Sequence, residues 1–91
     1  MSFDILYHEL VKKEDIPKLS KRMRERIRGA IEDKLYTHPE IFGKPLRKSR
    51  HPYRKLRVGD YRVIFKMEKS IVKVLIIEHR SVVYKHLKLR I

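Results

Sequence analysis

The sequence predicts an α+β domain in which two helices pack on one face of a small, mainly antiparallel twisted sheet, in the order βααβββ plus a C-terminal segment. Two observations lead to this prediction. Residues 19–36 carry apolar side chains at three- and four-residue spacing, which is typical of a helix with one buried stripe. Residues 53–78 contain three strand-like runs separated by short turns, which is typical of an antiparallel meander. Because 91 residues suffice for one core and not for two, we expect residues 1–91 to form a single domain.

The first half of the chain supplies one strand and both helices. FDILYH, residues 3–8, alternates apolar and polar side chains, which predicts a strand. A short helical segment over residues 9–16 should end before Pro17, because proline disfavours helical geometry in the preceding residue. Ser20 is the expected N-cap of the long helix, which runs to about residue 36. The buried stripe of this helix is formed by Leu19, Met23, Ile27, Ala30, Ile31 and Leu35.

The second half supplies the meander. Residues 37–48 contain two prolines and a glycine and are predicted to be a loop. Strands are predicted at residues 53–58, 61–67 and 71–78, with turns at the Gly-Asp and Lys-Ser pairs between them. The end of the chain, residues 79–91, is either a short helix or an irregular tail.

The first turn of the meander raises a question about charge. In LRVGDYR a two-residue Gly-Asp turn places Val58 opposite Tyr61 and Arg57 opposite Arg62. Like charges directly opposite each other destabilise a sheet. Two alternatives explain the arginines: their long stems spread into water and pair with an acidic neighbour such as Asp60 or Glu68, or the pair binds an anion.

Strand alternation separates an apolar face from a basic one. Side chains two apart share a face, so one face is formed by Leu56, Val58, Tyr61, Val63 and Phe65, and we expect the helices to cover it. The opposite face carries Tyr53, Lys55, Arg57, Arg62, Ile64 and Lys66. If Lys69 and Ser70 form a two-residue turn, Lys73 lies across from Lys66 and Ile77 lies across from Arg62. We therefore expect one core face and one basic surface.

The charge balance restricts the partners. The chain has 24 Lys and Arg against 11 Asp and Glu, a net charge of +13, and such a domain is expected to meet a polyanion. Nucleic acid comes first, with an acidic membrane surface or an acidic protein as alternatives. Basic residues on the long helix are either solvated or in contact with RNA.

Composition also excludes several classes of site. Zero cysteine excludes disulfides and thiolate metal sites, and the five histidines lack the spacing of a zinc site, so we expect no metal and no cofactor. The sequence contains no apolar run long enough to span a membrane and no secretory signal pattern. We therefore expect a cytoplasmic protein that does not act on a membrane.

The basic face has the chemistry that RNA cleavage without metal requires. Arginine donates paired hydrogen bonds to phosphate, and an aromatic ring stacks on an unpaired base. If the 2′-hydroxyl of RNA attacks the adjacent phosphate, the protein supplies a proton acceptor, a proton donor and cations around the phosphate. A lysine among other cations can also take part in proton transfer. The residues by themselves therefore predict a basic domain directed at RNA or DNA.

Two motifs in this sequence resemble a known family. R-x-G-D-Y-R-V-I-F occupies residues 57–65, and H-R-x-x-V-Y occupies residues 79–84. With the order of elements, they resemble the RelE/ParE superfamily of toxins from toxin–antitoxin systems. The second motif is more similar to the RelE branch of messenger-RNA endonucleases than to the ParE branch of gyrase poisons.

The resemblance implies an activity and assigns residues to it. RelE-like toxins cleave mRNA in the ribosomal A site through 2′-hydroxyl attack to a 2′,3′-cyclic phosphate, without metal. By the same likeness Lys55, Arg57 and Arg62 surround the scissile phosphate, and Arg80 adds a phosphate contact or assists the leaving group. Tyr84 stacks on a base and assists proton transfer, or alternatively closes the core.

Other positions are assigned less directly. His79 is either a proton donor or only the end of its strand. Glu78 takes the place of a catalytic cation if Arg80 merely supports the site. Tyr53 stands where RelE-type sites often have a lysine, and Arg54 should point to the other face unless a bulge turns it. The remaining expected RNA contacts are Arg24, Arg28, Arg47, Lys48, Arg50, Tyr53 and Arg54.

The resemblance also implies partners. An acidic RelB-like antitoxin would cover the basic face or displace the C-terminal segment and form a toxin–antitoxin hetero-oligomer. The ribosome and mRNA would be the targets. Two alternatives remain: a ParE-like inhibitor of DNA gyrase that cleaves nothing, and a non-catalytic RNA-binding module of the same fold.

Overall fold

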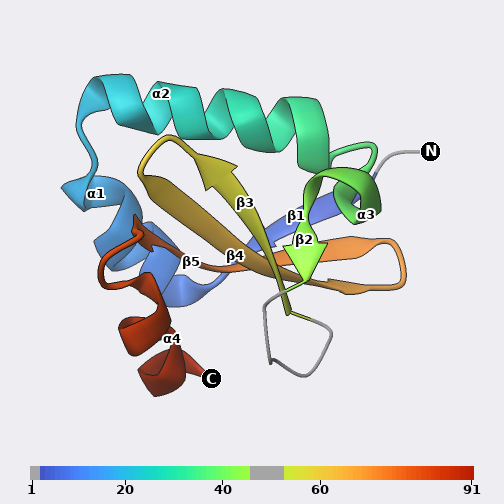
Figure 1. Cartoon of the computed structure of the whole chain (residues 1–91). Helices are drawn as coiled ribbons and strands as arrows, with labels where there is room; N and C mark the ends of the chain where they lie inside the picture. Colours follow the sequence, from blue (N-terminus) through green and yellow to red (C-terminus); the bar gives the residue numbers. More distant parts are fainter. Residues whose placement is uncertain (1–2, 46–52) are drawn as a thin grey trace.

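The computed structural model describes residues 3–45 and 53–91 and contains one five-stranded sheet in the order β1-β5-β4-β3-β2 (Figure 1). The strands are β1 (Asp4–Tyr7), β2 (Lys44–Pro45), β3 (Tyr53–Val58), β4 (Tyr61–Glu68) and β5 (Ile71–His79). β1 runs parallel to β5, and the other neighbours are antiparallel. The prediction of a mainly antiparallel sheet is confirmed.

Helical segments precede and follow the meander. The first comprises η1 (Val11–Asp15) and α1 (Ile16–Lys18), where η marks wider π-type turns. The prediction that it ends before Pro17 is wrong, because Pro17 lies at the start of α1, where proline is tolerated. The long one comprises α2 (Lys21–Ala30) and η2 (Ile31–Leu35). α3 (Pro39–Phe42) and α4 (Val83–Arg90) are short. The Ser20 hydroxyl accepts a hydrogen bond from the Met23 N–H at 3.1 Å, which confirms the predicted N-cap.

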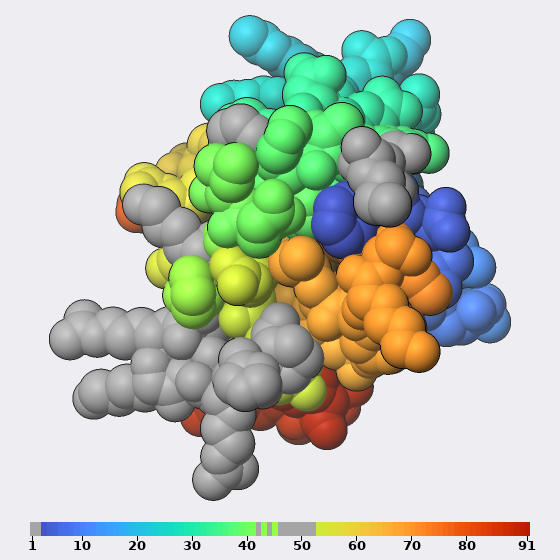
Figure 2. All heavy atoms as spheres, turned by 90° about the vertical axis from the view of Figure 1, so that its right-hand side faces the viewer, coloured from blue at the N-terminus to red at the C-terminus, as the bar shows by residue number. Residues whose placement is uncertain are grey.

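The first two helical segments cover one face of the sheet. The stripe residues Leu19, Ile27, Ile31 and Leu35 are buried against the apolar side chains of β3, β4 and β5. The strand residues in this core are Leu56, Val58, Val63, Phe65, Val72, Val74 and Ile77. Figure 2 shows α2 and the segment after it, in cyan to green, above the sheet edge and α4, in red, below it. The predicted packing of two helices on one face is confirmed.

The opposite face is not the open basic surface that strand alternation alone predicts. α4 covers its middle and buries a second apolar cluster of Ile64, Leu75, Ile76, Val83 and Leu87, with Tyr53 packed at its margin. The C-terminal segment is thus a helix, which decides between the two alternatives left by the sequence. The predicted loop 37–48 is also partly wrong, because α3 and β2 lie within it. Residues 46–48 lie outside the described part of the chain.

Both turns of the meander have two residues, as predicted. Val58 is paired with Tyr61 and Arg57 with Arg62, and Gly59 begins its turn with φ of 60°, a conformation that glycine adopts without strain. Lys66 is paired with Lys73. The prediction that Ile77 lies across from Arg62 is wrong, because the register shifts between Ile64 and Phe65.

The shift is a β-bulge on β5. Ile64 is paired with Ile76 and Phe65 with Val74, so Leu75 is the extra residue. From Ile76 onward the alternation of β5 is reversed. Glu78, and not Ile77, therefore lies opposite Arg62.

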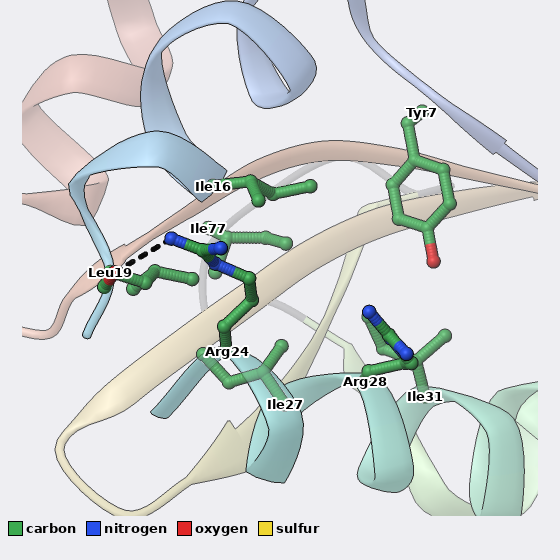
Figure 3. Close-up of a pocket in the computed structure, with 8 residues that line it drawn as sticks. All are labelled: Tyr7, Ile16, Leu19, Arg24, Ile27, Arg28, Ile31 and Ile77. Atoms are coloured by element: carbon green, nitrogen blue, oxygen red, sulfur yellow. Dashed lines mark hydrogen bonds between the residues drawn. The ribbon is translucent and has the colours of Figure 1, made fainter. Parts of the chain in front are cut away.

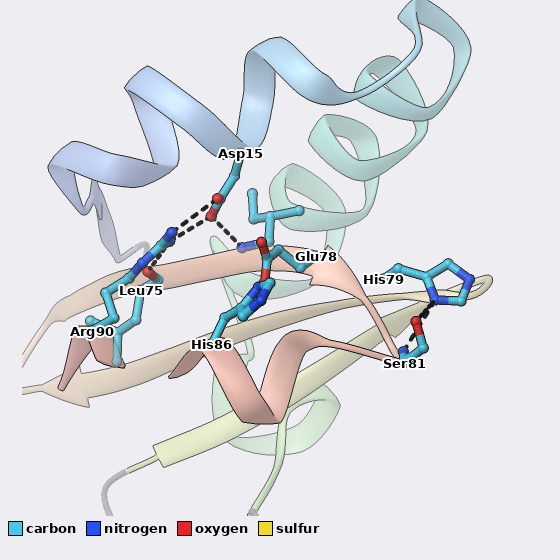
Figure 4. A network of polar contacts seen from close by, with 8 residues as sticks. Asp15, Leu75, Glu78, His79, Ser81, His86 and Arg90 are labelled. Carbon is cyan, nitrogen blue, oxygen red and sulfur yellow. Dashed lines mark hydrogen bonds and ion pairs between the residues drawn. The ribbon is translucent and has the colours of Figure 1, made fainter. Parts of the chain in front are cut away.

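A buried ion pair joins the layers on the two sides of β5 (Figure 4). Asp15 receives two hydrogen bonds from the Arg90 guanidinium, at 2.6 and 3.1 Å, and one from the Ile77 N–H at 2.9 Å. The same guanidinium donates to the Leu75 carbonyl at 3.0 Å. The C-terminal turn of α4 is thereby tied to η1, just beyond the bulge.

Candidate functional site

The Gly59-Asp60 turn gathers arginines from four parts of the fold. Arg57 and Arg62 flank it as direct neighbours on β3 and β4. The Arg80 N–H donates to the Asp60 carbonyl at 2.8 Å, and its side chain lies 3.8 Å from the Asp60 carboxylate. From α2, Arg26 comes so close that a Cβ added to Gly59 would lie 2.9 Å from its Nη1. The end of the hairpin is therefore the centre of a cationic cluster.

Arg62 does not project into solvent. Its side chain folds back under the turn, where Nη1 donates to the carbonyls of Gly59 at 3.0 Å and Tyr61 at 2.9 Å, and the residue is only 8% exposed. The alternative of a pair with Asp60 or Glu68 is wrong, because its partners are backbone carbonyls. Arg62 thus stabilises the turn, whereas Arg57 is exposed.

The remaining cations of this face fall into two groups. Lys66 and Lys73 both pair with Glu68, at 3.1 and 3.4 Å, and this pairing lowers the pKa of the Glu68 carboxyl. Lys55 and Arg57 form no ion pair with any of the chain's 11 acidic residues, all of which lie in the described part of the chain. The positive charge that is free to bind an anion is concentrated toward the hairpin end of β3.

His79 lies at the same end of the sheet but on the helical face. It is paired with Tyr61, and the two rings meet edge to face with centroids 5.7 Å apart. Its Nδ1 accepts a hydrogen bond from the Ser81 N–H at 3.1 Å, which assigns the proton of the neutral ring to Nε2. His79 therefore lies on the opposite face of the sheet from Lys55 and Arg57.

Glu78 and Tyr84 take different positions on the α4 side. The Glu78 carboxylate binds His86 of α4 at 2.6 Å, so it is engaged by the helix that covers this face (Figure 4). Tyr84 lies in the first turn of α4, is 39% exposed and belongs to neither apolar cluster. The alternative in which Tyr84 closes the core is therefore wrong.

Several expected RNA contacts lie away from this cluster. Arg54 points to the helical face, as alternation predicts, and donates to the Gly43 carbonyl at 2.9 Å. Arg24 and Arg28 line a cavity on the helical face (Figure 3). Tyr53 is half-buried beside the α4 cluster. Arg47, Lys48 and Arg50 lie outside the described residues.

Arg26 is the residue that sequence reasoning missed. It stands between Arg24 and Arg28 on the same helix, and all three are equally basic. Successive helical residues are rotated by about 100°, so neighbours two apart point to different sides. Only the position of the hairpin relative to α2 shows that Arg26 meets the Gly59 turn. The spacing of residues along α2 therefore does not predict the contact between Arg26 and the Gly59 turn.

Neither a metal centre nor a membrane span is found in the described parts of the chain. Within residues 3–45 and 53–91 no three His, Cys, Asp or Glu side chains gather in a way that could hold a metal ion. Across the same residues no helix is long and apolar enough to cross a membrane.

The chain thus combines a helical pair over a five-stranded sheet with arginines gathered at the Gly59-Asp60 hairpin. Residues 3–84 match the family model described as "ParE toxin of type II toxin-antitoxin system, parDE". The chain belongs to this family and hence to the RelE/ParE superfamily, and it is a type II toxin.

Solved structures show the same fold. The toxin–antitoxin complex RelBE2 from Mycobacterium tuberculosis contains a chain that matches with a TM-score of 0.78 and 23% identity, over 88% of this chain and 100% of that one. The RelB-RelE antitoxin–toxin complex from Methanococcus jannaschii matches with a TM-score of 0.68 and 21% identity, over 89% and 96%. A comparison with curated protein sequences finds no match.

Proposed function

We propose that this toxin is a metal-independent endoribonuclease that cleaves mRNA on the ribosome and so stops translation in the cytoplasm. The observation that supports this best is the state of Lys55 and Arg57. Both lie on one face beside the turn that Arg62 braces, and neither is neutralised by a carboxylate of the chain. Unpaired cations beside a rigid turn fit a phosphate of RNA better than they fit a purely structural role.

The proposed reaction uses the RNA's own 2′-hydroxyl. Its oxygen forms a bond to the adjacent phosphorus, its proton passes to a base, and the bond to the 5′ oxygen breaks as that oxygen takes up a proton. The products are a 2′,3′-cyclic phosphate and a 5′-hydroxyl. Arg57 would stabilise the extra negative charge on the phosphate, with Lys55 beside it for charge and proton transfer.

The remaining groups have supporting roles in this proposal. Arg62 holds the turn through its two carbonyl contacts and so fixes Arg57. Tyr84 is exposed enough to stack on a base. His79 would donate the Nε2 proton only if the RNA passes around the end of the sheet, since its ring lies on the face of Tyr61. Arg26 and Arg80 would hold flanking phosphates.

The partners follow from the toxin class. The chain's charge of +13 suits both ribosomal RNA and an acidic antitoxin. The matched solved structures are complexes of a toxin with its antitoxin. We therefore propose a hetero-oligomer with an acidic antitoxin as the silent form, and the ribosome with bound mRNA as the target of the free toxin.

The test is controlled induction in a bacterial host with mapping of mRNA 5′ ends. We expect codon-phased cuts with the natural chain, and their loss with Arg57→Gln, an exposed position where folding is not at stake. Arg22→Gln on α2, also exposed, is the matched control and should cut normally. Growth arrest with intact mRNA would overturn the proposal.

A gyrase inhibitor is the second candidate, and the family description favours it because it names ParE. The burial of Arg62, which leaves one cation fewer at the hairpin, also suits a toxin that cleaves nothing. Trapped gyrase–DNA complexes after induction would support this candidate. A chain that causes no arrest at all would instead be a non-catalytic RNA-binding module.

A further inference from the structure

A cavity of about 220 Å³ opens between the helices and the sheet, on the face away from Lys55 and Arg57 (Figure 3). Its apolar part is formed by Leu19 and by four isoleucines: Ile16, Ile27, Ile31 and Ile77. Arg24, Arg28 and Tyr7 bring polar groups to the same space. An apolar cavity bordered by two cations is suited to a ligand that is both apolar and acidic.

Arg24 is the more unusual of the two cations. Its Nη2 donates to the Leu19 carbonyl at 3.2 Å, and its Nε is buried without a hydrogen-bond partner. A guanidinium has five N–H donors, and in Arg24 the Nε–H is the one that is buried without an acceptor. Leaving a buried donor unpaired is unfavourable, and an added acceptor beside Arg24 would remove part of that cost.

Neither arginine forms an ion pair within the described residues of the chain. All 11 acidic residues lie in the described part of the chain, and neither Arg24 nor Arg28 forms an ion pair with any of them. Burial raises the pKa of the Tyr7 hydroxyl, Glu32 raises it further, and Arg28 acts in the opposite direction. Glu32 stands one turn beyond Arg28, so an incoming carboxylate meets least repulsion at Arg24.

The size of the cavity indicates what kind of molecule enters it. Pockets for free small molecules usually hold about 300 to 1,000 Å³ and enclose most of the ligand. This cavity is smaller and open to the surface. It therefore suits one or two side chains that belong to a larger partner.

We propose that this cavity anchors the acidic antitoxin: an apolar side chain inserts among the isoleucines, and a carboxylate about one helical turn away pairs with Arg24. This inference rests on the antitoxin partner of the proposed function and gives that partner a place. The anchor lies on the opposite face of the sheet from Lys55 and Arg57, the cations assigned to the reacting phosphate. Binding there leaves the RNA site open, so inhibition requires a second, separate contact.

The experiment uses a synthetic alanine-based helical peptide with one leucine followed by glutamates three and four residues later, and the same peptide with both glutamates replaced by glutamine. Affinities for the full chain are measured by calorimetry, without RNA. We expect the acidic peptide to bind at least about tenfold more tightly than the neutral one. Arg24→Gln should reduce this preference to less than about twofold, while Arg22→Gln, on the exposed side of α2, should keep it.

A second arm separates the anchor from the RNA site. A short single-stranded RNA at saturating concentration should leave the affinity of the acidic peptide unchanged. Equal affinity for both peptides, no binding of either, or equal effects of Arg24→Gln and Arg22→Gln would overturn the anchor. Displacement of the peptide by RNA would overturn its separation from the RNA site. Because the binding assay involves no cleavage, these outcomes are independent of whether mRNA is cut during induction.

Discussion

The two faces of the sheet differ in how many of their side chains are buried in an apolar cluster. On the face covered by the first two helical segments, twelve of the described residues form one buried cluster that reaches from η1 to β5. On the face covered by α4, five described residues form a smaller cluster around Ile64 and Ile76. Beyond that cluster the second face carries Lys55, Arg57 and the pairs of Glu68. One face is devoted to folding, and the other leaves room for a charged site.

The largest expected effect comes from truncating the larger cluster. Phe65→Ala removes a fully buried ring that fits against Gly43, where even an added Cβ would lie 2.1 Å from it. We expect the free energy of unfolding to fall by about 3–5 kcal/mol in chemical denaturation.

Ile64→Ala, on the same strand but facing α4, is the matched comparison. It should remove hydrogen-exchange protection from α4 while α2 stays protected, since only the smaller cluster is cut. If both variants expose both helices equally, the two clusters are one cooperative unit.

The second-largest effect is expected from breaking the Asp15–Arg90 ion pair, which joins the two sides of β5. Asp15→Asn leaves the Arg90 guanidinium without its charged partner in a buried site, since the side chain of Arg90 is only 7% exposed. Breaking one partner of a buried pair costs about 3–5 kcal/mol, and we expect the lower end because asparagine retains an acceptor. The double variant Asp15→Asn, Arg90→Met should recover part of the loss. An additive double variant would contradict this coupling.

The opposed arginines give a smaller and unequal pair of effects. Arg62→Ala removes two hydrogen bonds to turn carbonyls and should lower the free energy of unfolding by about 1–3 kcal/mol. Arg57→Ala, at an exposed position, should change it by less than about 0.5 kcal/mol. Equal changes in thermal denaturation would mean that the two side chains share one role.

The smallest effect is a pH dependence on the α4 face. Hydrogen bonds from Lys66 and then Lys73 hold the pKa of the Glu68 carboxyl below its usual 4.5. A lowered folded-state pKa contributes stability that is present above pH 4.5 and lost as the pH falls through the folded-state pKa. NMR titration of the Glu68 side chain should show a midpoint below 4.5, and Lys73→Gln should move it upward. A midpoint at or above 4.5 would contradict the pairing.

Local patterns predicted those parts of the fold that depend on local physics. The helical stripe, the Ser20 cap and the register of the Gly59-Asp60 turn need only residues a few positions apart, and all three are observed. The bulge at Leu75 could not be predicted from the sequence. It lies inside the continuous apolar run VLII, residues 74–77, in which no residue type distinguishes the extra residue from its neighbours. The packing of α4 likewise depends on an apolar patch contributed by distant strands.

The parts of the candidate site that were predicted are those that depend only on the alternation of side chains along a strand. Alternation placed Lys55 and Arg57 on one face and sent Arg54 to the other. It could not show that Arg62 folds under the turn, since that depends on which carbonyls lie within reach. It also could not distinguish Arg26 from its helical neighbours, because the approach of the hairpin to α2 is a tertiary contact.

The bulge at Leu75 sets how much the length of β5 can vary. Val72 and Val74 face the helical side before the bulge, and Ile77 faces that side after it. β5 contributes to both clusters in this way because Leu75 interrupts the regular alternation of its side chains. Because Leu75 is the extra residue, deleting it would leave a continuous ladder in which Ile77 still faces the helical core and Glu78 still lies opposite Arg62, at the loss of the Leu75 side chain from the smaller cluster. The bulge is therefore the place where β5 can lose one residue without changing which side chains face each layer, and relatives of this chain can differ by one residue between the Lys69 turn and His79.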